Sequence, residues 1–93
     1  MNVRFHVDPE TDEPHVHRHR VSEEEATDTL ASPIEDRPGH GGARVAVGQT
    51  RDGRYLRVIY VPDAAQNGLF CITAYDLSPK ALHALRRRRR KKP

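Results

Sequence analysis

The feature that most constrains this chain is an Asp52-Gly53 pair between two runs rich in β-branched and aromatic residues. The first run covers residues 44–50 and the second covers residues 55–61. An Asp-Gly pair in this setting is the strongest short-range signal for a β-hairpin, because a two-residue type I′ turn needs positive φ at both central residues. The pattern therefore predicts two antiparallel strands joined by a tight turn.

A two-residue loop fixes the register of this hairpin. It places Val47 opposite Val58 and Val45 opposite Tyr60. A shift of one residue would send these side chains to opposite faces of the sheet. The apolar pattern therefore favours the register that the turn dictates.

A third run, residues 69–75, extends the hairpin to a three-stranded meander if Tyr60 lies opposite Phe70. One face of the predicted sheet then carries the apolar side chains of Val45, Val47, Leu56, Val58, Tyr60, Phe70, Ile72 and Ala74. The other face is mixed and carries Arg44, Gly48, Tyr55, Arg57, Ile59, Cys71, Thr73 and Tyr75. We expect helices on the first face, because a sheet that is apolar on one side must bury that side. Any chemistry on the sheet is expected on the second face, where Tyr55 is predicted to pair with Tyr75.

The segment before the meander predicts further elements. Residues 2–7 alternate between apolar and polar side chains, which predicts a first strand, and the turn residues of segment 8–14 end it. Residues 15–21 are predicted either to pair back as a short strand or to run extended. Residues 34–42 are rich in glycine and are predicted to form a mobile loop.

Two helix starts are indicated by their capping residues. Ser22 and Glu25 form the Ser-x-x-Glu pattern of a capping box, so a helix should begin there and end before Pro33. Ser78 and Pro79 predict a second helix, with the serine as N-cap and the proline at the first helical position. The predicted fold is therefore α+β, with both helices packed on one face of an antiparallel sheet.

Length and composition set limits on the domain. The 93 residues form one small domain, which we assign to residues 1–85, followed by a basic tail at residues 86–93. Because only 35% of the residues are hydrophobic, the core must be thin, which leaves stabilisation by a partner or by self-association open. The single cysteine, Cys71, cannot form an internal disulfide and predicts a reducing cytoplasm. No apolar run is long enough for a signal peptide or a membrane span, so no membrane partner is expected.

The net charge of +3 conceals an asymmetry. Residues 86–92 are all cationic and contribute +7, which leaves 9 Lys and Arg against 13 Asp and Glu in the rest of the chain. The basicity therefore belongs to the tail and not to the domain.

Four pieces of the sequence, in order, resemble BrnT toxins of the RelE/ParE-like superfamily. They are His19-Arg20-Val21-Ser22-x-Glu24-Glu25-Ala26, a loop with Pro33, Gly53-Arg54-Tyr55-Leu56-x-Val58-x-Tyr60, and Ile72-Thr73-Ala74 before a basic helix. The corresponding family segments read Gly-Val-Ser-x-Glu-Glu-Ala, Gly-Arg-x-Leu-x-Val-x-Tyr and Ile-Ser-Ala. Two positions differ, because Tyr75 stands where the family has Arg and Arg20 stands where it has Gly.

The resemblance implies a small RelE-like toxin of a type II toxin–antitoxin system, acting in a bacterial cytoplasm. Such a toxin inhibits translation by cleaving mRNA without a metal or other cofactor, and an antitoxin encoded beside it neutralises it. The alternative is a non-catalytic member of the fold that binds a protein or RNA partner. Tyr75 is the reason for that alternative, since a tyrosine supplies no permanent cation to a phosphorane.

RNA cleavage without a metal requires a base for the 2′-hydroxyl, cations for the charge that develops on phosphorus, and an acid for the leaving oxygen. On the mixed face, Arg57 and Arg44 are candidates to hold phosphate. Tyr55 or Tyr75 could stack on a base or donate a proton, and His19 could act as acid or base, since imidazole titrates near neutral pH. In the structural alternative, the two tyrosines are an ordinary cross-strand pair and Arg57 is a solvated neighbour.

The cationic residues predicted to bind RNA are Arg44, Arg54, Lys80, Arg86, Arg87, Arg88, Arg89 and Arg90. Adjacent cations repel one another, which favours a polyanionic partner for the tail. That partner could be RNA, the ribosome or an acidic segment of the antitoxin. A solvated tail is the remaining alternative.

Three alternate histidines, His15, His17 and His19, are also candidate metal ligands, because alternate residues share one face of a strand. His17, His19 and Glu23 have the spacing of part of a cupin metal motif. The flanking glycines and the distant histidine of that motif are absent, so the sequence favours no metal site. Cys71 is expected to fill a small apolar space, without a nucleophilic role.

Overall fold

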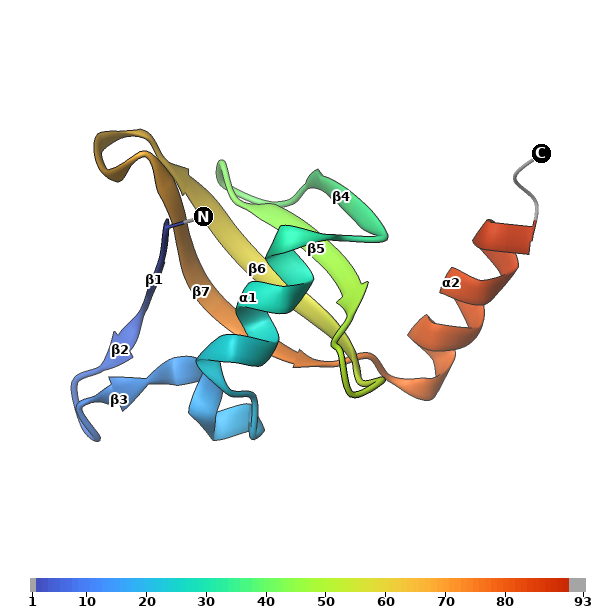
Figure 1. Cartoon of the computed structure of the whole chain (residues 1–93), viewed down its shortest axis with the longest axis horizontal. Helices are drawn as coiled ribbons and strands as arrows, with labels where there is room; N and C mark the ends of the chain where they lie inside the picture. Colours follow the sequence, from blue (N-terminus) through green and yellow to red (C-terminus); the bar gives the residue numbers. More distant parts are fainter. Residues whose placement is uncertain (1, 91–93) are drawn as a thin grey trace.

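The computed structural model describes residues 2–90, with the backbone alone at Gln66, and it confirms the α+β class. The strands are β1 (Asn2–Phe5), β2 (Val7–Asp8), β3 (Glu13–Pro14), β4 (Glu35–Pro38), β5 (Arg44–Gln49), β6 (Tyr55–Asp63) and β7 (Gly68–Asp76). The helices are η1 (His15–His19, 3-10), α1 (Glu23–Ala31), η2 (Ala64–Gln66, 3-10) and α2 (Pro79–Arg90). The main sheet has the strand order β1-β7-β6-β5-β4, and α1 lies across one of its faces (Figure 1).

The predicted hairpin between β5 and β6 is present, but its loop has three residues instead of two. The N–H of Thr50 donates to the carbonyl of Arg54 at 2.8 Å, and the N–H of Gly53 donates to the carbonyl of Thr50 at 3.0 Å. Gly53 has a φ of 92°, as the last residue of such a loop requires. The buried Thr50 hydroxyl also donates to the Asp52 carboxylate and accepts the N–H of Arg54. These side-chain bonds close the longer loop.

The longer loop shifts the register by one residue. Val47 lies opposite Arg57 and not opposite Val58, while Val45 lies opposite Ile59, so the predicted register is wrong. Both valines therefore share a face with the arginine. The Asp-Gly signal identified the turn correctly, but it does not distinguish a two-residue loop from a three-residue loop that ends in glycine.

A β-bulge changes the second half of the meander. Tyr60 lies opposite Cys71 instead of Phe70, because Ile72 is left out of the pairing. The bulge resets the alternation of β7, so that Cys71 and Ala74 both face the core. The predicted alignment of Tyr60 with Phe70 is therefore wrong.

We call the side of the sheet that α1 covers the core face and the opposite side the outer face. The core face carries Ala46, Gly48, Leu56, Val58, Tyr60, Cys71 and Ala74. The outer face carries Val45, Val47, Tyr55, Arg57, Ile59, Phe70, Thr73 and Tyr75. A Cβ at Gly48 would lie 3.1 Å from Cγ2 of Thr29, so the glycine permits α1 to approach β5 closely. Six residues thus lie on the side opposite to the prediction: Arg44, Val45, Val47, Gly48, Phe70 and Cys71.

The N-terminal segment differs from the prediction in three ways. β1 ends at Phe5 and pairs in parallel with β7, and β2 and β3 form a separate small hairpin. Residues 15–19 form the helix η1, so the prediction of a strand or extended segment there is wrong. η1 packs beside β7, where Val16 is buried in the core. The predicted mobile loop at residues 34–42 is also partly wrong, because β4 pairs with β5.

Both helix starts are confirmed. The Ser22 hydroxyl accepts the N–H of Glu25 and the Glu25 carboxylate accepts the N–H of Ser22, each at 3.0 Å. This is the predicted capping box. At α2, the Ser78 hydroxyl accepts the N–H of Ala81 at 3.1 Å, as the N-cap prediction requires.

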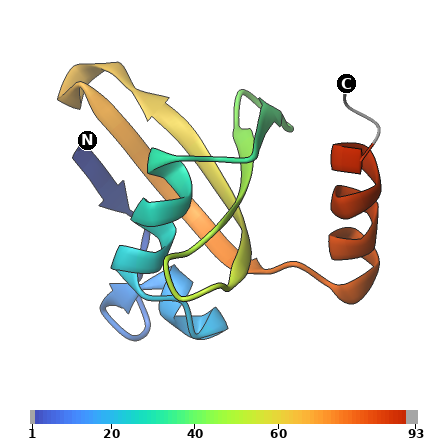
Figure 2. The same ribbon diagram turned by 45° about the vertical axis from the view of Figure 1, so that its right-hand side comes forward.

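The position of α2 contradicts the prediction that both helices cover one face. Arg88 forms an ion pair with Glu35 of β4 at 2.8 Å, and the guanidinium of Arg86 lies 5.9 Å from the ring centre of Tyr55. Both partners belong to the outer face, since Glu35 pairs with Val47. Figure 2 shows α2 beyond the end of β7, away from α1. The helix includes basic residues 86–90, while residues 91–93 of the predicted tail lie outside the described part of the chain.

Within residues 2–90, no helix is long and apolar enough to cross a membrane.

The buried Cys71 gives a prediction about reactivity. Its side chain is 0% exposed, and this burial raises the pKa of the thiol to about 12. We expect native protein at pH 8 to resist alkylation by iodoacetamide, with full reaction after unfolding in guanidinium. In the unfolded chain the thiol ionises near its ordinary pKa of 9.0, whereas in the folded protein it ionises only near pH 12. The stability of the folded state should therefore fall as pH rises from 9 towards 12. Rapid native labelling at pH 8, measured by mass spectrometry, would show that the thiol is accessible.

Candidate functional site

Arg57 lies at the centre of the outer face. On neighbouring strands its partners are Val47 and Tyr75, so the predicted cross-strand pair of Tyr55 with Tyr75 is wrong. The Arg57 side chain is half-buried, and within residues 2–90 it has no hydrogen-bond or ion-pair partner. A guanidinium has five N–H donors and no acceptor, so this group is available to an anion.

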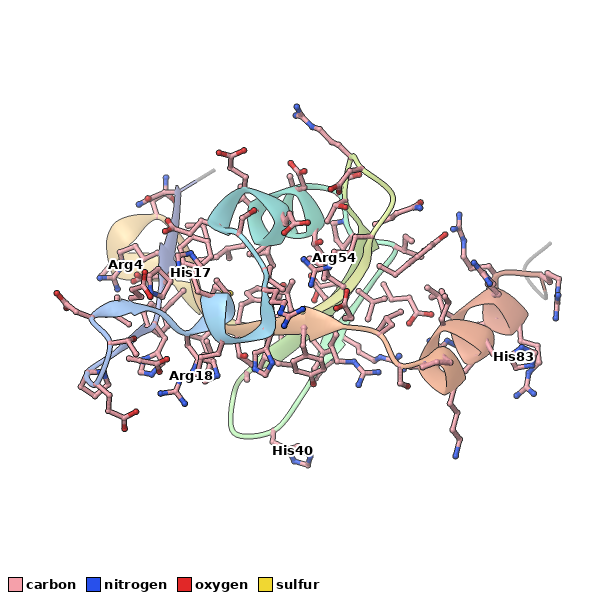
Figure 3. All side chains as sticks on the ribbon, turned by 90° about the horizontal axis from the view of Figure 1, so that it is seen from below. Arg4, His17, Arg18, His40, Arg54 and His83 are labelled. Carbon is pink, nitrogen blue, oxygen red and sulfur yellow. The ribbon has the colours of Figure 1, made fainter. Side chains whose placement is uncertain are left out.

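A groove of about 390 Å³ lies on the outer face beside Arg57. Its lining residues are Arg37, Pro38, Gly39, His40, Val45, Arg57, Ile59 and Tyr75. The β4–β5 connection forms one wall, and Figure 3 shows His40 on this connection, on the side of the sheet away from α1. Sequence reasoning missed Arg37 and His40. Only the hairpin pairing of β4 with β5 brings them next to Arg57, and no local pattern indicates it.

His19 reaches the same face from η1. Its ring centre lies 5.7 Å from that of Tyr75, with the two rings edge to face. The structure therefore brings together three of the four residues predicted as catalytic: His19, Arg57 and Tyr75. The fourth, Tyr55, lies two residues from Arg57 on the same side of β6, against the Arg86 guanidinium.

The His19 ring also belongs to a longer row. We call the rings of Phe70, His6, His15, His19 and Tyr75 the ring row; successive ring centres are 6.4, 6.1, 5.4 and 5.7 Å apart. At its far end, the guanidinium of Arg4 lies 5.5 Å from the Phe70 ring centre. The row starts at Phe70 of β7, passes through His6, which follows β1, and through His15 and His19 of η1, and returns to β7 at Tyr75. It was not predicted, since it depends on the parallel pairing of β1 with β7.

Asp8 holds the middle of the ring row in place. Its Oδ1 lies 2.9 Å from Nδ1 of His15, and its Oδ2 lies 2.7 Å from Nε of Arg18. The hydrogen bond with His15, with a further contribution from Arg18, holds the pKa of the Asp8 carboxyl below its usual range. The carboxylate therefore stays ionised, fixes the His15 ring and neutralises Arg18. Figure 3 shows Arg18 on the outer side.

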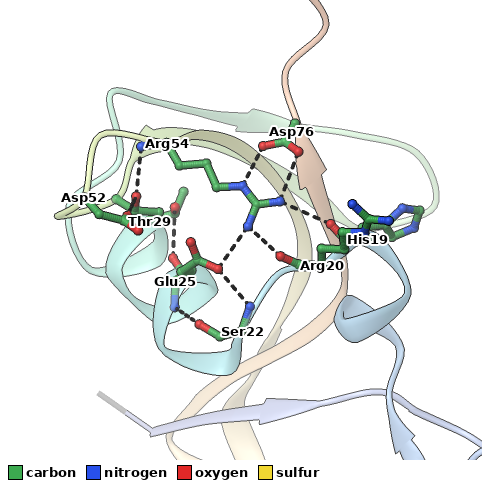
Figure 4. A network of polar contacts seen from close by, with 9 residues as sticks. His19, Arg20, Ser22, Glu25, Thr29, Asp52, Arg54 and Asp76 are labelled. Atoms are coloured by element: carbon green, nitrogen blue, oxygen red, sulfur yellow. Dashed lines mark hydrogen bonds and ion pairs between the residues drawn. The ribbon is translucent and has the colours of Figure 1, made fainter.

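Arg54, predicted to bind RNA, is instead the centre of an internal network (Figure 4). Its Nε and Nη2 donate to the two carboxylate oxygens of Asp76 at 2.6 and 3.0 Å. Its Nη1 donates to the carbonyl of Arg20 at 2.6 Å and to the Glu25 carboxylate at 3.0 Å, while Nη2 also donates to the carbonyl of His19 at 3.2 Å. The network joins β6, the end of β7, the end of η1 and the capping box of α1. It leaves Arg54 no free donor for a ligand.

Arg20 has a backbone conformation that favours glycine. Its φ is 57°, in the left-handed region, and it ends η1. This is the position where the BrnT toxins have Gly. The Arg54 bond to its carbonyl helps to hold this conformation.

The other predicted RNA-binding residues are dispersed. Arg44 lies on the core side of the sheet edge, where its guanidinium donates to Asp36 at 3.0 Å, so it is not near Arg57. Arg86 and Arg88 lie on the side of α2 nearest the sheet, and Glu35 raises the pKa of Arg88. Exposed positions on α2 are occupied by Lys80, Arg87, Arg89 and Arg90.

The histidines do not form a metal site in the described part of the chain. Among residues 2–90 there is no group of three or more His, Cys, Asp or Glu side chains that could hold a metal ion. His15, His17 and His19 lie in a 3-10 helix and not along a strand, so the three do not all share one face as alternate strand residues would; only the rings of His15 and His19 are neighbours, 5.4 Å apart.

Comparisons with protein-family models, with curated proteins and with solved structures find no match for this chain. The likeness to BrnT toxins therefore rests on the sequence segments alone.

Proposed function

We propose that this protein is a translation-inhibiting endoribonuclease that cleaves mRNA without a metal and is neutralised by an antitoxin. The observation that supports this most is the grouping of Arg57, Tyr75 and His19 beside an open groove. The group combines an unpaired cation, a phenol and an imidazole. These are the kinds of group that metal-free RNA cleavage needs.

Each residue has a role in the proposed reaction. His19 accepts the proton of the 2′-hydroxyl, and the 2′-oxygen forms a bond to phosphorus. The bond from phosphorus to the 5′-oxygen breaks, and the Tyr75 hydroxyl donates a proton to that leaving oxygen. Arg57 holds the non-bridging oxygens as negative charge builds on them. The products are a 2′,3′-cyclic phosphate and a 5′-hydroxyl, and a proton passing from His19 to Tyr75 through solvent restores the enzyme.

The left-handed backbone at Arg20 gives the resemblance physical support. A glycine at the corresponding position in BrnT toxins fits the same turn between η1 and the capping box. The turn sets the direction of the chain immediately after His19. An antitoxin would neutralise the toxin by covering the outer face or the basic helix α2.

The second candidate is a protein of this fold that binds RNA or a protein without cleaving anything. Tyr75 favours it, since the BrnT toxins have Arg at that position. In this candidate Arg57 holds phosphate and the tyrosine only stacks on a base.

Inducible expression in a bacterial host tests the proposal. We expect growth arrest and mRNA fragments, and the purified protein should cleave RNA in EDTA to leave 2′,3′-cyclic phosphate ends. The Tyr75→Arg variant separates the candidates. If the wild type binds RNA without cleaving it and Tyr75→Arg gains cleavage, the second candidate holds. Absence of both RNA binding and cleavage in the wild type would reject both RNA readings.

A further inference from the structure

The ring row extends well beyond the groups that the proposed reaction uses. His6 and His19 are exposed, and His15, Phe70 and Tyr75 are half-buried. Neighbouring ring centres are 5.4 to 6.4 Å apart over the whole row. At the Tyr75 end the row meets Arg57 and the groove.

Charge alone does not explain this surface. Two cations beside the row are already neutralised, because Arg4 pairs with Asp63 at 2.6 Å and Arg18 pairs with Asp8 at 2.7 Å and with Glu10 at 2.6 Å. Within residues 2–90, the cations without an ion pair near this surface are Arg20, which follows His19, and, beyond the Tyr75 end, Arg57 and residues of α2. A ligand that follows the row must therefore gain its affinity from contact with the rings, and it must carry negative charge where it reaches Arg57.

Single-stranded nucleic acid has both properties. Its unpaired bases stack on aromatic side chains with little dependence on sequence, and its phosphates pair with arginine. A duplex does not fit this pattern, since its bases are stacked on one another. An acidic peptide would pair with Arg57 but would leave the rings unused.

We propose that the ring row is a binding path for single-stranded RNA, along which successive unpaired bases stack while the phosphate chain enters the groove at Arg57. This inference rests on the proposed function, because it names the form of RNA that the site accepts. It adds an expected preference: unpaired RNA, several nucleotides long, with little base selectivity. His6 and Phe70 are then binding residues outside the reacting group.

The test measures the binding of a fluorescein-labelled 2′-O-methyl octauridine at fixed salt. This probe has no free 2′-hydroxyl, so binding is read without cleavage. We expect His6→Ala and His19→Ala each to weaken binding by roughly 5- to 100-fold, the range for loss of one base–aromatic stack. Phe70→Leu should weaken it similarly while keeping the apolar bulk of the side chain. The Arg54 bond to His19 uses the backbone carbonyl, so His19→Ala leaves that network intact.

Matched controls come from the same chain. His17→Ala removes an exposed histidine in the same helix η1 that is not part of the row, and it should leave affinity unchanged. An RNA hairpin of equal charge should bind at least several-fold more weakly than the single strand.

The outcomes separate this inference from the proposed function. If RNA is cleaved but His6→Ala, Phe70→Leu and His17→Ala all bind like the wild type, the ring row is not the RNA-binding path. The proposed nuclease activity is still supported in that case. If the row variants weaken binding and no cleavage occurs, the ring row is supported as the RNA-binding path and the proposed nuclease activity is rejected. Equal affinity for the duplex, or full displacement by polyglutamate of equal charge, would overturn the path.

Discussion

Replacing Arg57 with alanine is expected to lower the rate of RNA cleavage by roughly 10²- to 10³-fold, the usual loss when one donor to a developing oxyanion is removed. Arg57 lies directly opposite Tyr75, and within residues 2–90 it forms no ion pair with a carboxylate. Growth arrest on induction should disappear with the same substitution. Single-turnover cleavage in EDTA measures the effect.

Two comparisons show whether this loss is chemical. Arg57→Lys keeps the charge but not the planar fork, so its rate should lie between those of the wild type and the alanine variant. Arg51→Ala removes a cation whose side chain is 92% exposed and should cleave normally. Since Arg57 has no internal partner, its removal should change the free energy of unfolding by no more than about 0.5 kcal/mol. Unchanged cleavage by a folded Arg57→Ala protein would contradict its role.

Replacing Arg54 with alanine is expected to lower the free energy of unfolding by about 3 kcal/mol, since hydrogen bonds to charged groups contribute about 1.5–3 kcal/mol each and unpaired partners remain. Its side chain is only 23% exposed, and it donates to Asp76, Glu25 and the carbonyls of Arg20 and His19. For a domain of this size, such a loss lowers Tm by roughly 10–20 °C. Urea unfolding followed by circular dichroism measures it.

Arg51→Ala is the matched control, because Arg51 lies in the hairpin loop that Arg54 follows and its contact to Asp28 is long, at 3.6 Å. Its stability should be close to that of the wild type. An Arg54→Ala protein as stable as Arg51→Ala would mean that the network contributes little.

The Arg54 network also predicts a dependence on pH. The hydrogen bond from Arg54 lowers the pKa of Asp76 below its ordinary value of 3.8. This pair therefore contributes stability above about pH 4, and the contribution is lost as pH falls through the lowered pKa in the folded state. The loss of stability between pH 4 and pH 2 should be shallower in Arg54→Ala than in the wild type.

Part of the site follows from sequence alone. Residue type and place in the predicted meander indicate Arg57 and Tyr75, residue type alone indicates His19, and the structure does bring the three together. The reason for the selection was partly wrong, because the assumed register paired Tyr55 with Tyr75. Arg57 nevertheless stays on the same side as Tyr75, since both lie on the outer face in either register.

Two arginines that were predicted to bind RNA form contacts within the protein instead. Arg54 follows the loop glycine in sequence, and nothing local shows that Asp76, 22 residues later, will receive its guanidinium. Arg44 is predicted on the same face as Arg57, but the three-residue loop turns it to the other side of the sheet. In both cases a long-range contact decides whether a cation is free.

By itself, the sequence determined the local elements with strong chemical signals: the hairpin turn at Asp52-Gly53, the capping box at Ser22 and Glu25, and the start of α2 at Ser78. These depend on the φ angles and hydrogen bonds of a few adjacent residues. Tertiary structure alone decided the register, the bulge, the parallel pairing of β1 with β7, the ring row and the position of α2. Each of these depends on contacts between distant segments, and the alternatives differ by one residue in a sheet whose two faces both carry apolar side chains.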